Sequence, residues 1–254
     1  MMILKAIALK KIFQNNHQVP ATTALDYIDI ALSEGSFTSI MGPSGSGKTT
    51  LLNILSGLSE PTCGEVYIRE QNLSGMDKDT LARFRRSNLG FIFQDYNLLD
   101  GLTVKENIML PQILAKDDIS YMQEKANHFM RLFTITDIAD KYPNQISGGQ
   151  QQRCAIARAL MNSTGIVFAD EPTGSLDSKS AKLVMKAFEK ANQENKATIL
   201  MVTHDPYTAS YSNRVIFIKD GRIETEIYRK NTQKEFFQNI MDNLAALEGE
   251  CGEF

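Results

Sequence analysis

The stretch GPSGSGKTT, Gly42–Thr50, decides the fold class of this sequence. It opens with the pattern G-x-x-x-x-G-K-[S/T], and it stands between an apolar run, SFTSIM, and a helical pattern, KTTLLNILSGL. In such a loop the glycines let backbone N–H groups close around phosphate oxygens, and the following helix directs its positive dipole end to the same anion. The stretch therefore predicts a phosphate-binding loop in a strand–loop–helix unit.

The side chains of this phosphate-binding loop have separate expected roles. Lys48 should reach the β- and γ-phosphates of a nucleotide, and the Thr49 hydroxyl should ligate Mg²⁺. Further contacts to the phosphates are expected from the rest of the loop: Gly42, Ser44, Gly45, Ser46, Gly47 and Thr50. A glycine-rich turn with a chance lysine is the alternative, and the strand–loop–helix context counts against it.

Segments on both sides of the loop predict an α/β fold. Residues 2–13 and 24–35 alternate as two antiparallel strands around a loop over residues 14–23. Further strand patterns occupy residues 36–41, 64–70, 89–94, 165–170, 197–204 and 214–221. Helical patterns occupy residues 48–58, 103–115, 118–133, 147–163, 178–195 and 233–247. Strands that alternate with helices favour a mostly parallel sheet covered on both faces.

We expect one domain over residues 1–254, built from three parts. Residues 1–94 and 163–225 would form the catalytic core, with the antiparallel strands at its start. Residues 95–162 carry helical patterns and predict an inserted helical subdomain. Residues 226–254 would form an amphipathic C-terminal helix and a polar tail, with the apolar stripe of the helix packed on the same domain and packing on a partner as the alternative.

Polar residues end three of the predicted strands. GIVFADEP places Asp170 at a strand end, where a carboxylate facing phosphates needs a cation, so Asp170 is the expected Mg²⁺ partner. Glu171 would point the opposite way along the pleat, toward the attacking water, as the general base. His204 ends ATILMVTH and would contact the γ-phosphate, and Gln94 ends LGFIFQ and would ligate Mg²⁺ or water. Open parallel sheets bind ligands at this edge, whereas an acidic turn and a core histidine are the alternatives.

A second glycine motif, ISGGQQQR, runs from Ile146 to Arg153. Ser147 fits a helix N-cap and Gln150 follows three residues later, which is a capping-box pattern. The start of the following helix is thus an anion site built from backbone N–H groups, a hydroxyl and a dipole. Many helices begin with Ser-Gly and bind nothing, so this motif alone leaves its function open.

The order of the motifs is more specific than any one of them. GPSGSGKT, the strand-end glutamine, SGGQ, FADEP, SLD and TH follow one another over about 160 residues. This series resembles the nucleotide-binding domain of ATP-binding-cassette (ABC) proteins, and the resemblance covers nearly the whole chain. It implies a P-loop ATPase that uses ATP and Mg²⁺ and works as a head-to-tail dimer with a second copy of itself.

The resemblance also gives the second glycine motif a role. The family's signature loop, which closes on the γ-phosphate bound by the partner copy, corresponds to Ser147, Gly148, Gly149 and Gln150. Asp177, in SLD, matches the loop that crosses the dimer interface. Phe13 stands where the family often has a tyrosine that stacks on adenine. Ile146 in place of leucine and Phe13 in place of tyrosine are small departures from the family pattern.

Composition narrows the classes of function. The chain has 254 residues and a formal net charge of −3, without an apolar run of about 18 residues or a signal-peptide pattern. It shows no sustained heptads and no Lys/Arg cluster for a DNA track, which disfavours a chromosome or DNA-repair ATPase and predicts no nucleic-acid partner. Its three cysteines lack metal-like spacing and predict reduced thiols.

A transporter role implies a separate membrane permease and a peripheral position on the cytoplasmic face of the membrane. DYNLLDGLTVKENIMLP, which follows Gln94, mixes apolar and charged residues and is the expected docking groove, with simple subdomain packing as the alternative. GFIFQDYNLLDGLTVKENI and FADEPTGSLDSKSA resemble the branch of macrolide-exporter and lipoprotein-release ATPases, and more closely the bacitracin-type antimicrobial-peptide transporters. That branch implies peptide resistance and raises a sensor histidine kinase as a further partner.

Overall fold

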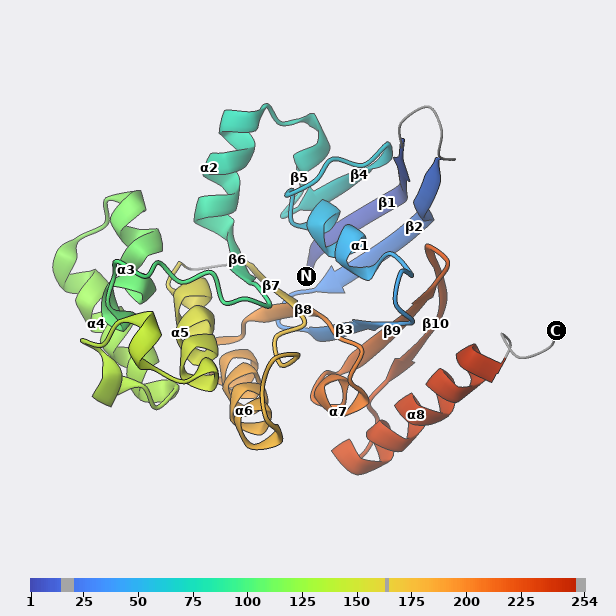
Figure 1. The fold of residues 1–254 in the computed structure, drawn as a ribbon. Helices are drawn as coiled ribbons and strands as arrows, with labels where there is room; N and C mark the ends of the chain where they lie inside the picture. Colours follow the sequence, from blue (N-terminus) through green and yellow to red (C-terminus); the bar gives the residue numbers. More distant parts are fainter. Residues whose placement is uncertain (15–20, 163–164, 250–254) are drawn as a thin grey trace. The chain divides into compact units, whose positions relative to one another are not determined.

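The chain divides into two compact units in the computed structural model, which describes residues 1–14, 21–162 and 165–249. The first unit contains Met1–Asp77 and Leu200–Phe254, and the second contains Lys78–Ile199. Figure 1 labels the helices and strands of both. The end of the predicted tail, with Cys251, and most of the predicted 14–23 loop lie outside the described residues.

The first unit begins with an antiparallel sheet, as the alternating pattern predicts. Its strand order is β2-β1-β4-β5, formed by β1 (Met2–Phe13), β2 (Thr22–Ser33), β4 (Cys63–Ile68) and β5 (Gln71–Asn72). β1 pairs with both β2 and β4, and the sheet buries Leu4, Leu9 and Leu25 completely. Burial of these apolar side chains is what fixes one face of each strand inward.

The strand–loop–helix unit around the phosphate-binding loop lies in the same first unit. β3 (Phe37–Met41) leads into the loop, and α1 (Lys48–Leu55) follows it, three residues shorter than the helix predicted over 48–58. β3 pairs in parallel with β9 (Arg214–Lys219), which pairs antiparallel with β10 (Arg222–Tyr228). The sequence did not predict β10, which crosses the boundary that we expected at residue 225 between the catalytic core and the C-terminal part. The division into three parts stays a prediction.

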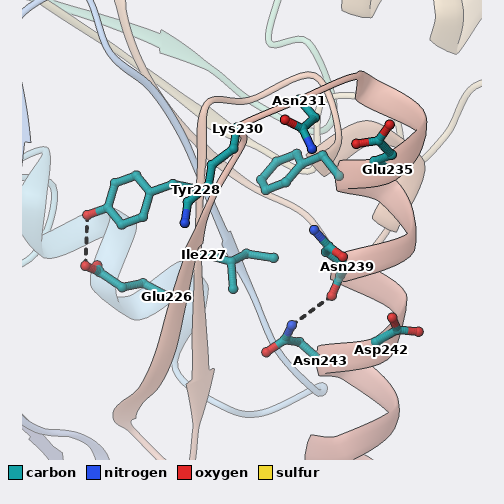
Figure 2. A pocket seen from close by; sticks show the side chains of 10 residues that line it. Glu226, Ile227, Tyr228, Lys230, Asn231, Glu235, Asn239, Asp242 and Asn243 are labelled. Carbon is teal, nitrogen blue, oxygen red and sulfur yellow. Dashed lines mark hydrogen bonds between the residues drawn. The ribbon is translucent and has the colours of Figure 1, made fainter.

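The C-terminal helix α8 (Gln233–Gly249) packs on its own unit, in agreement with its amphipathic pattern. Phe236 and Ile240 are buried in a cluster with Met41 and Phe217, from β3 and β9. Leu244 continues the same stripe one turn later, whereas Met241 is 41% exposed. Figure 2 shows the cavity of about 430 Å³ that remains between β10 and α8, with mostly polar side chains around it.

The second unit contains most of the helices and two parallel strands. Its elements are α2 (Lys78–Asn88), β6 (Leu89–Ile92), α3 (Val104–Ala115), α4 (Ile119–Leu132), α5 (Gly148–Leu160), β7 (Ile166–Asp170) and α6 (Ser178–Asn195). β6 and β7 pair in parallel, with Ile92 opposite Ala169. β8 (Thr198–Val202) contains the boundary between the units, and α7 (Pro206–Ala209) follows it. Among the described helices, none has the length and apolar character needed to cross a membrane.

Candidate active site

The phosphate-binding loop in the first unit requires glycine at two positions. Gly42 has φ +151°, and a Cβ there would lie 2.0 Å from the Ile218 carbonyl oxygen. Gly47 has φ +97°, and its Cβ would lie 2.3 Å from the Ala24 carbonyl oxygen. Because real Cβ atoms do not approach backbone so closely, side chains at these positions would displace the loop. The glycines predicted for phosphate binding are thus also required by the packing of β2 and β9.

The ammonium group of Lys48 lies within the curve of this loop. Its Nζ donates to the carbonyl oxygens of Gly42 (3.0 Å) and Pro43 (2.7 Å) and approaches the Ser46 hydroxyl (3.5 Å). Gly47, which has no side chain to cap α1, precedes the helix in a left-handed conformation. A buried cation and an N-terminal helix dipole at one concave loop suit an anion such as a nucleotide phosphate.

Two more predicted residues lie in the first unit. The N–H of Thr203, the residue after β8, donates to the Ile40 carbonyl of β3 (3.2 Å). His204 therefore follows the end of β8, beside the end of β3 that leads into the phosphate-binding loop. His204 is exposed. Phe13 ends β1 with 45% of its surface exposed, and Lys11 Nζ lies 5.2 Å from its ring centroid. An exposed aromatic face is what stacking on a base requires.

The strand-end carboxylates and Gln94 lie in the second unit. Asp170 is the last residue of β7, and Gln94 follows the neighbouring β6 by two residues. A Cβ on Gly174 would lie 3.5 Å from the Glu171 carbonyl oxygen and 3.8 Å from Gln94 Nε2. Gln94 and the turn after β7 are therefore close neighbours, as the shared edge of two parallel strands predicts.

The reason given for the direction of Glu171 needs correction. We expected strand alternation to turn its side chain away from that of Asp170. β7 ends at Asp170, however, and Glu171 has φ +44°, which is a left-handed conformation rather than an extended one. The turn, and not the pleat, sets the direction of this side chain. Non-glycine residues in such conformations often occur at functional sites.

The signature motif begins α5 with the predicted capping box. The Ser147 hydroxyl accepts from the Gln150 N–H (3.4 Å), and the Gln150 side chain accepts from the Ser147 N–H (2.9 Å). A Cβ on Gly149 would lie 2.9 Å from Ser180 Cβ, and one on Gly148 would lie 2.8 Å from the Tyr96 hydroxyl. Gly149 is therefore needed for close packing within the second unit, whereas a side chain at Gly148 would require the end of the Tyr96 side chain to shift.

Asp177 caps α6. Its carboxylate accepts from the hydroxyl of Ser180 (2.6 Å) and from the N–H groups of Lys179 and Ser180 (3.0 and 3.1 Å). These hydrogen bonds, the Ser180 hydroxyl first among them, lower the pKa of the Asp177 carboxyl below its ordinary value. The residue assigned to the dimer interface thus also stabilises the start of a helix.

The contacts that hold the loop after Gln94 were not predicted from the sequence. The Arg158 guanidinium donates to the carbonyls of Tyr96 (2.8 Å) and Asn97 (2.5 Å), both at left-handed φ. The Tyr96 hydroxyl bonds to that of Ser175 (2.8 Å), beside the signature loop. Buried Asn107 exchanges hydrogen bonds with the backbone of Leu99. No short-range pattern signals these contacts, since up to 79 residues separate the partners.

The residues predicted to bind Mg²⁺ all offer oxygen atoms. Across residues 1–14, 21–162 and 165–249, no group of three or more His, Cys, Asp or Glu side chains could hold a metal. Thr49, Gln94 and Asp170 offer a hydroxyl, an amide and a carboxylate. Mg²⁺ prefers oxygen ligands and usually takes few from the protein, with the rest from phosphates and water, so the chemistry of each predicted ligand fits Mg²⁺ rather than zinc.

Comparison with known proteins identifies the family. A family model described as ABC transporter matches residues 25–174. The chain belongs to this family. As an ABC protein it binds ATP and hydrolyses it, and it is the ATPase subunit of a transporter.

The relatives of this ABC ATPase include an uncharacterized protein, a bacitracin exporter and a macrolide exporter. The uncharacterized ABC transporter ATP-binding protein YvcR of Bacillus subtilis is 46% identical over 254 residues, covering 100% of this chain and 98% of YvcR. The bacitracin export ATP-binding protein BceA of Halalkalibacterium halodurans is 49% identical over 223 residues, 87% of this chain and 88% of BceA. The macrolide export ATP-binding/permease protein MacB of Campylobacter jejuni is 40% identical over 235 residues, 92% of this chain but 36% of MacB.

A solved ABC structure supports the fold. The dimeric post-hydrolysis structure of MJ0796 from Methanocaldococcus jannaschii, bound to ADP and Pi, is 39% identical and has a TM-score of 0.82. The match covers 91% of this chain and 100% of MJ0796. The α/β fold of an ABC nucleotide-binding domain, with its antiparallel N-terminal sheet and helical part, is confirmed.

Proposed function

We propose that the residues predicted from the motifs form the ATPase site of this transporter subunit. The phosphate-binding loop and Lys48 bind the phosphates, and Phe13 stacks on the adenine. Mg²⁺ is bound by the oxygen ligands Thr49, Gln94 and Asp170. Glu171 accepts the proton of the attacking water, and His204 contacts the γ-phosphate. The observation that carries this proposal is the Lys48 ammonium inside a concave loop at a helix N-terminus.

Substitution of Glu171 by glutamine tests the catalytic assignment. Glutamine keeps the size of the side chain but cannot accept a proton, and loss of a general base slows a reaction by about 100- to 10,000-fold. ATP hydrolysis by Glu171→Gln should fall by that factor, while equilibrium binding of ATP should persist. Hydrolysis at the wild-type rate would show that Glu171 is not the base.

The working form is a head-to-tail dimer of two copies, in which Ser147–Gln150 of one copy close on the nucleotide bound by the other. Support comes from the dimeric structures of MJ0796, which is 39–40% identical. Ser147→Arg adds bulk and a cation at this contact, so we expect ATP binding by the monomer to survive while dimer closure and hydrolysis fail. A cysteine cross-link between the phosphate-binding loop of one copy and the signature loop of the other would map the contact. Cross-links found only within one chain would contradict it.

A separate membrane permease is the second partner, bound at the cytoplasmic face of the membrane. The loop after Gln94 supplies a docking surface: Leu99 is 49% exposed there, although Asn107 and Arg158 fix the surrounding backbone. A cavity of about 200 Å³, lined in part by Leu110, Pro111 and Leu114, adjoins α3 in the same unit. A rigid backbone with exposed apolar side chains suits binding to a protein partner.

The substrate we propose is an antimicrobial peptide of the bacitracin type, so that the transporter gives resistance to such peptides. The 49% identity to BceA over most of both chains supports this assignment. Macrolide export is the second candidate, because MacB proteins are 40–44% identical. A sensor histidine kinase would be a further partner in the first case.

Drug sensitivity of host cells separates the two substrates. Cells that carry Glu171→Gln in place of the wild-type chain should become more sensitive to cell-wall-active peptides and not to macrolides. Expression of both proteins at equal level, measured by immunoblot, is the control. Increased macrolide sensitivity with unchanged peptide sensitivity would reject the peptide assignment in favour of macrolide export.

A further inference from the structure

The turn between β9 and β10 has a fixed geometry. Asp220 and Gly221 have φ +48° and +76°, and Lys219 pairs with Arg222 across them. Two left-handed residues between antiparallel strands form the turn that Asp-Gly favours, because its twist matches that of the strands. We name residues Asp220–Arg222 the hairpin tip. Its conformation depends on glycine, since a side chain at φ +76° is strained.

The backbone of Gly221 connects the phosphate-binding loop to β2. Its N–H donates to the Ser46 carbonyl in the loop (3.2 Å), and its carbonyl accepts from the Asp26 N–H in β2 (2.9 Å). A Cβ on Gly221 would lie 2.8 Å from the Ala24 carbonyl oxygen. The hairpin tip therefore lies directly between two segments that are distant in sequence, without room for a side chain.

Charged side chains fasten the hairpin tip to β2. Arg222 donates from Nε and Nη2 to Asp26 Oδ2, at 2.9 and 2.5 Å, and Lys10 Nζ lies 3.2 Å from Asp26 Oδ1. The hydrogen bonds from Arg222 and then Lys10 lower the pKa of the Asp26 carboxyl. Asp26 therefore stays ionised at neutral pH, so its ion pairs with Arg222 and Lys10 are present there.

The same elements border the phosphate-binding loop along its length. Gly42 abuts the Ile218 carbonyl on β9, and Gly47 abuts the Ala24 carbonyl on β2, each too closely for a Cβ. Ser46, between them, is hydrogen-bonded to Gly221. The curve of the loop is thus set by the backbone of β9, the hairpin tip and β2. A change in the hairpin tip must move the loop at Ser46, next to Lys48.

We propose that the hairpin tip positions the phosphate-binding loop for ATP, with Gly221 and Arg222 as positioning residues. This inference rests on the proposed role of the loop in ATP binding. A loop that adopts its binding conformation for only a fraction of the time has an apparent dissociation constant larger by the inverse of that fraction. Loss of the hairpin tip contact should therefore weaken ATP binding and raise KM, while kcat at saturating ATP is retained.

The test compares Gly221→Ala with Gly64→Ala in the full chain. Gly64 is also left-handed (φ +95°), and a Cβ there would lie 2.5 Å from the Ala8 carbonyl oxygen; it lies on β4, outside the phosphate-binding loop. Both variants should lose thermal stability, but only Gly221→Ala should bind a fluorescent ATP analogue with Mg²⁺ about tenfold more weakly. Equal affinity in the two glycine variants would overturn the inference.

Two further variants keep the outcome decisive. Arg222→Gln leaves the backbone unchanged, so it tests the positioning role even if Gly221→Ala fails to fold. Glu224→Gln, on the same strand, is the control for Arg222→Gln. Arg222→Gln should raise KM for ATP about threefold and leave kcat within about twofold; an unchanged KM overturns the inference. Lys48→Ala tests the proposed function separately. If Lys48→Ala binds the ATP analogue like the wild type, the assignment of the loop itself is wrong.

Discussion

Replacement of Phe236 by alanine tests how α8 is attached to the first unit. Phe236 is 2% exposed and lies in the cluster with Met41 and Phe217. A buried phenylalanine hides about 200 Å² of mostly apolar surface, which corresponds to about 5 kcal/mol at about 25 cal/mol per Å². Measured Phe→Ala substitutions in cores cost about 3–5 kcal/mol. We expect Phe236→Ala to lower the free energy of unfolding by an amount in that range.

The neighbouring Phe237 provides a matched control. It is only partly buried and is not a member of the cluster, so Phe237→Ala should cost about 1 kcal/mol or less. Urea unfolding followed by far-UV circular dichroism compares the two variants, because the chain contains no tryptophan for fluorescence. Equal losses from Phe236→Ala and Phe237→Ala would refute the packing described for α8.

Three other outcomes follow from single residues. Burial raises the pKa of the Cys154 thiol to about 12, so at pH 8 only about one molecule in 10⁴ carries the Cys154 thiolate. After treatment of the folded protein with iodoacetamide, peptide mapping should find the exposed Cys63 alkylated and Cys154 unmodified. The lowered pKa of Asp177 adds stability above the ordinary aspartate pKa, and this stability is lost as pH falls through the folded value. Urea unfolding of Asp177→Asn should therefore depend less on pH below about pH 4 than that of the wild type. Phe13→Ala should weaken ATP and GTP binding alike, by about 1–3 kcal/mol, while Phe13→Tyr changes it little; unaltered affinity in Phe13→Ala would move the stacking to another residue.

The sequence predicted the bounds of a helix well where residues at both of its ends favour a start and a stop. The helix predicted over residues 178–195 has those bounds because Asp177 caps its start and Lys196 ends it in a left-handed conformation. α2 was missed because Phe84 is its only buried residue, which leaves no apolar periodicity to detect. β10 was missed although Ile223 and Ile227 alternate with exposed residues, since its other side chains are polar.

Much of the candidate site was predictable for similar reasons. The strand–loop–helix unit around Lys48 and the capping box of Ser147 depend on residues close together in sequence, and the structure contains both. What could not be predicted are contacts between distant segments. The hydrogen bond of Tyr96 to Ser175 and the contact of Gly221 with Ser46 join residues 79 and 175 positions apart, and no periodic pattern encodes them.

The glycines of the signature motif show why motif and packing must be considered together. As a motif, Gly148 and Gly149 let backbone approach a phosphate. In the structure, a Cβ on Gly149 would lie too close to Ser180, and a Cβ on Gly148 would displace the Tyr96 hydroxyl. Loss of hydrolysis on substitution of either glycine would therefore be explained by changed packing, whether or not the motif contacts ATP. Ser147 is different, because its side chain is exposed and its loss removes one capping contact at a cost of about 1 kcal/mol. A variant at Ser147 that keeps the fold and abolishes hydrolysis therefore reports on the contact with the second copy, which substitution of either glycine cannot do.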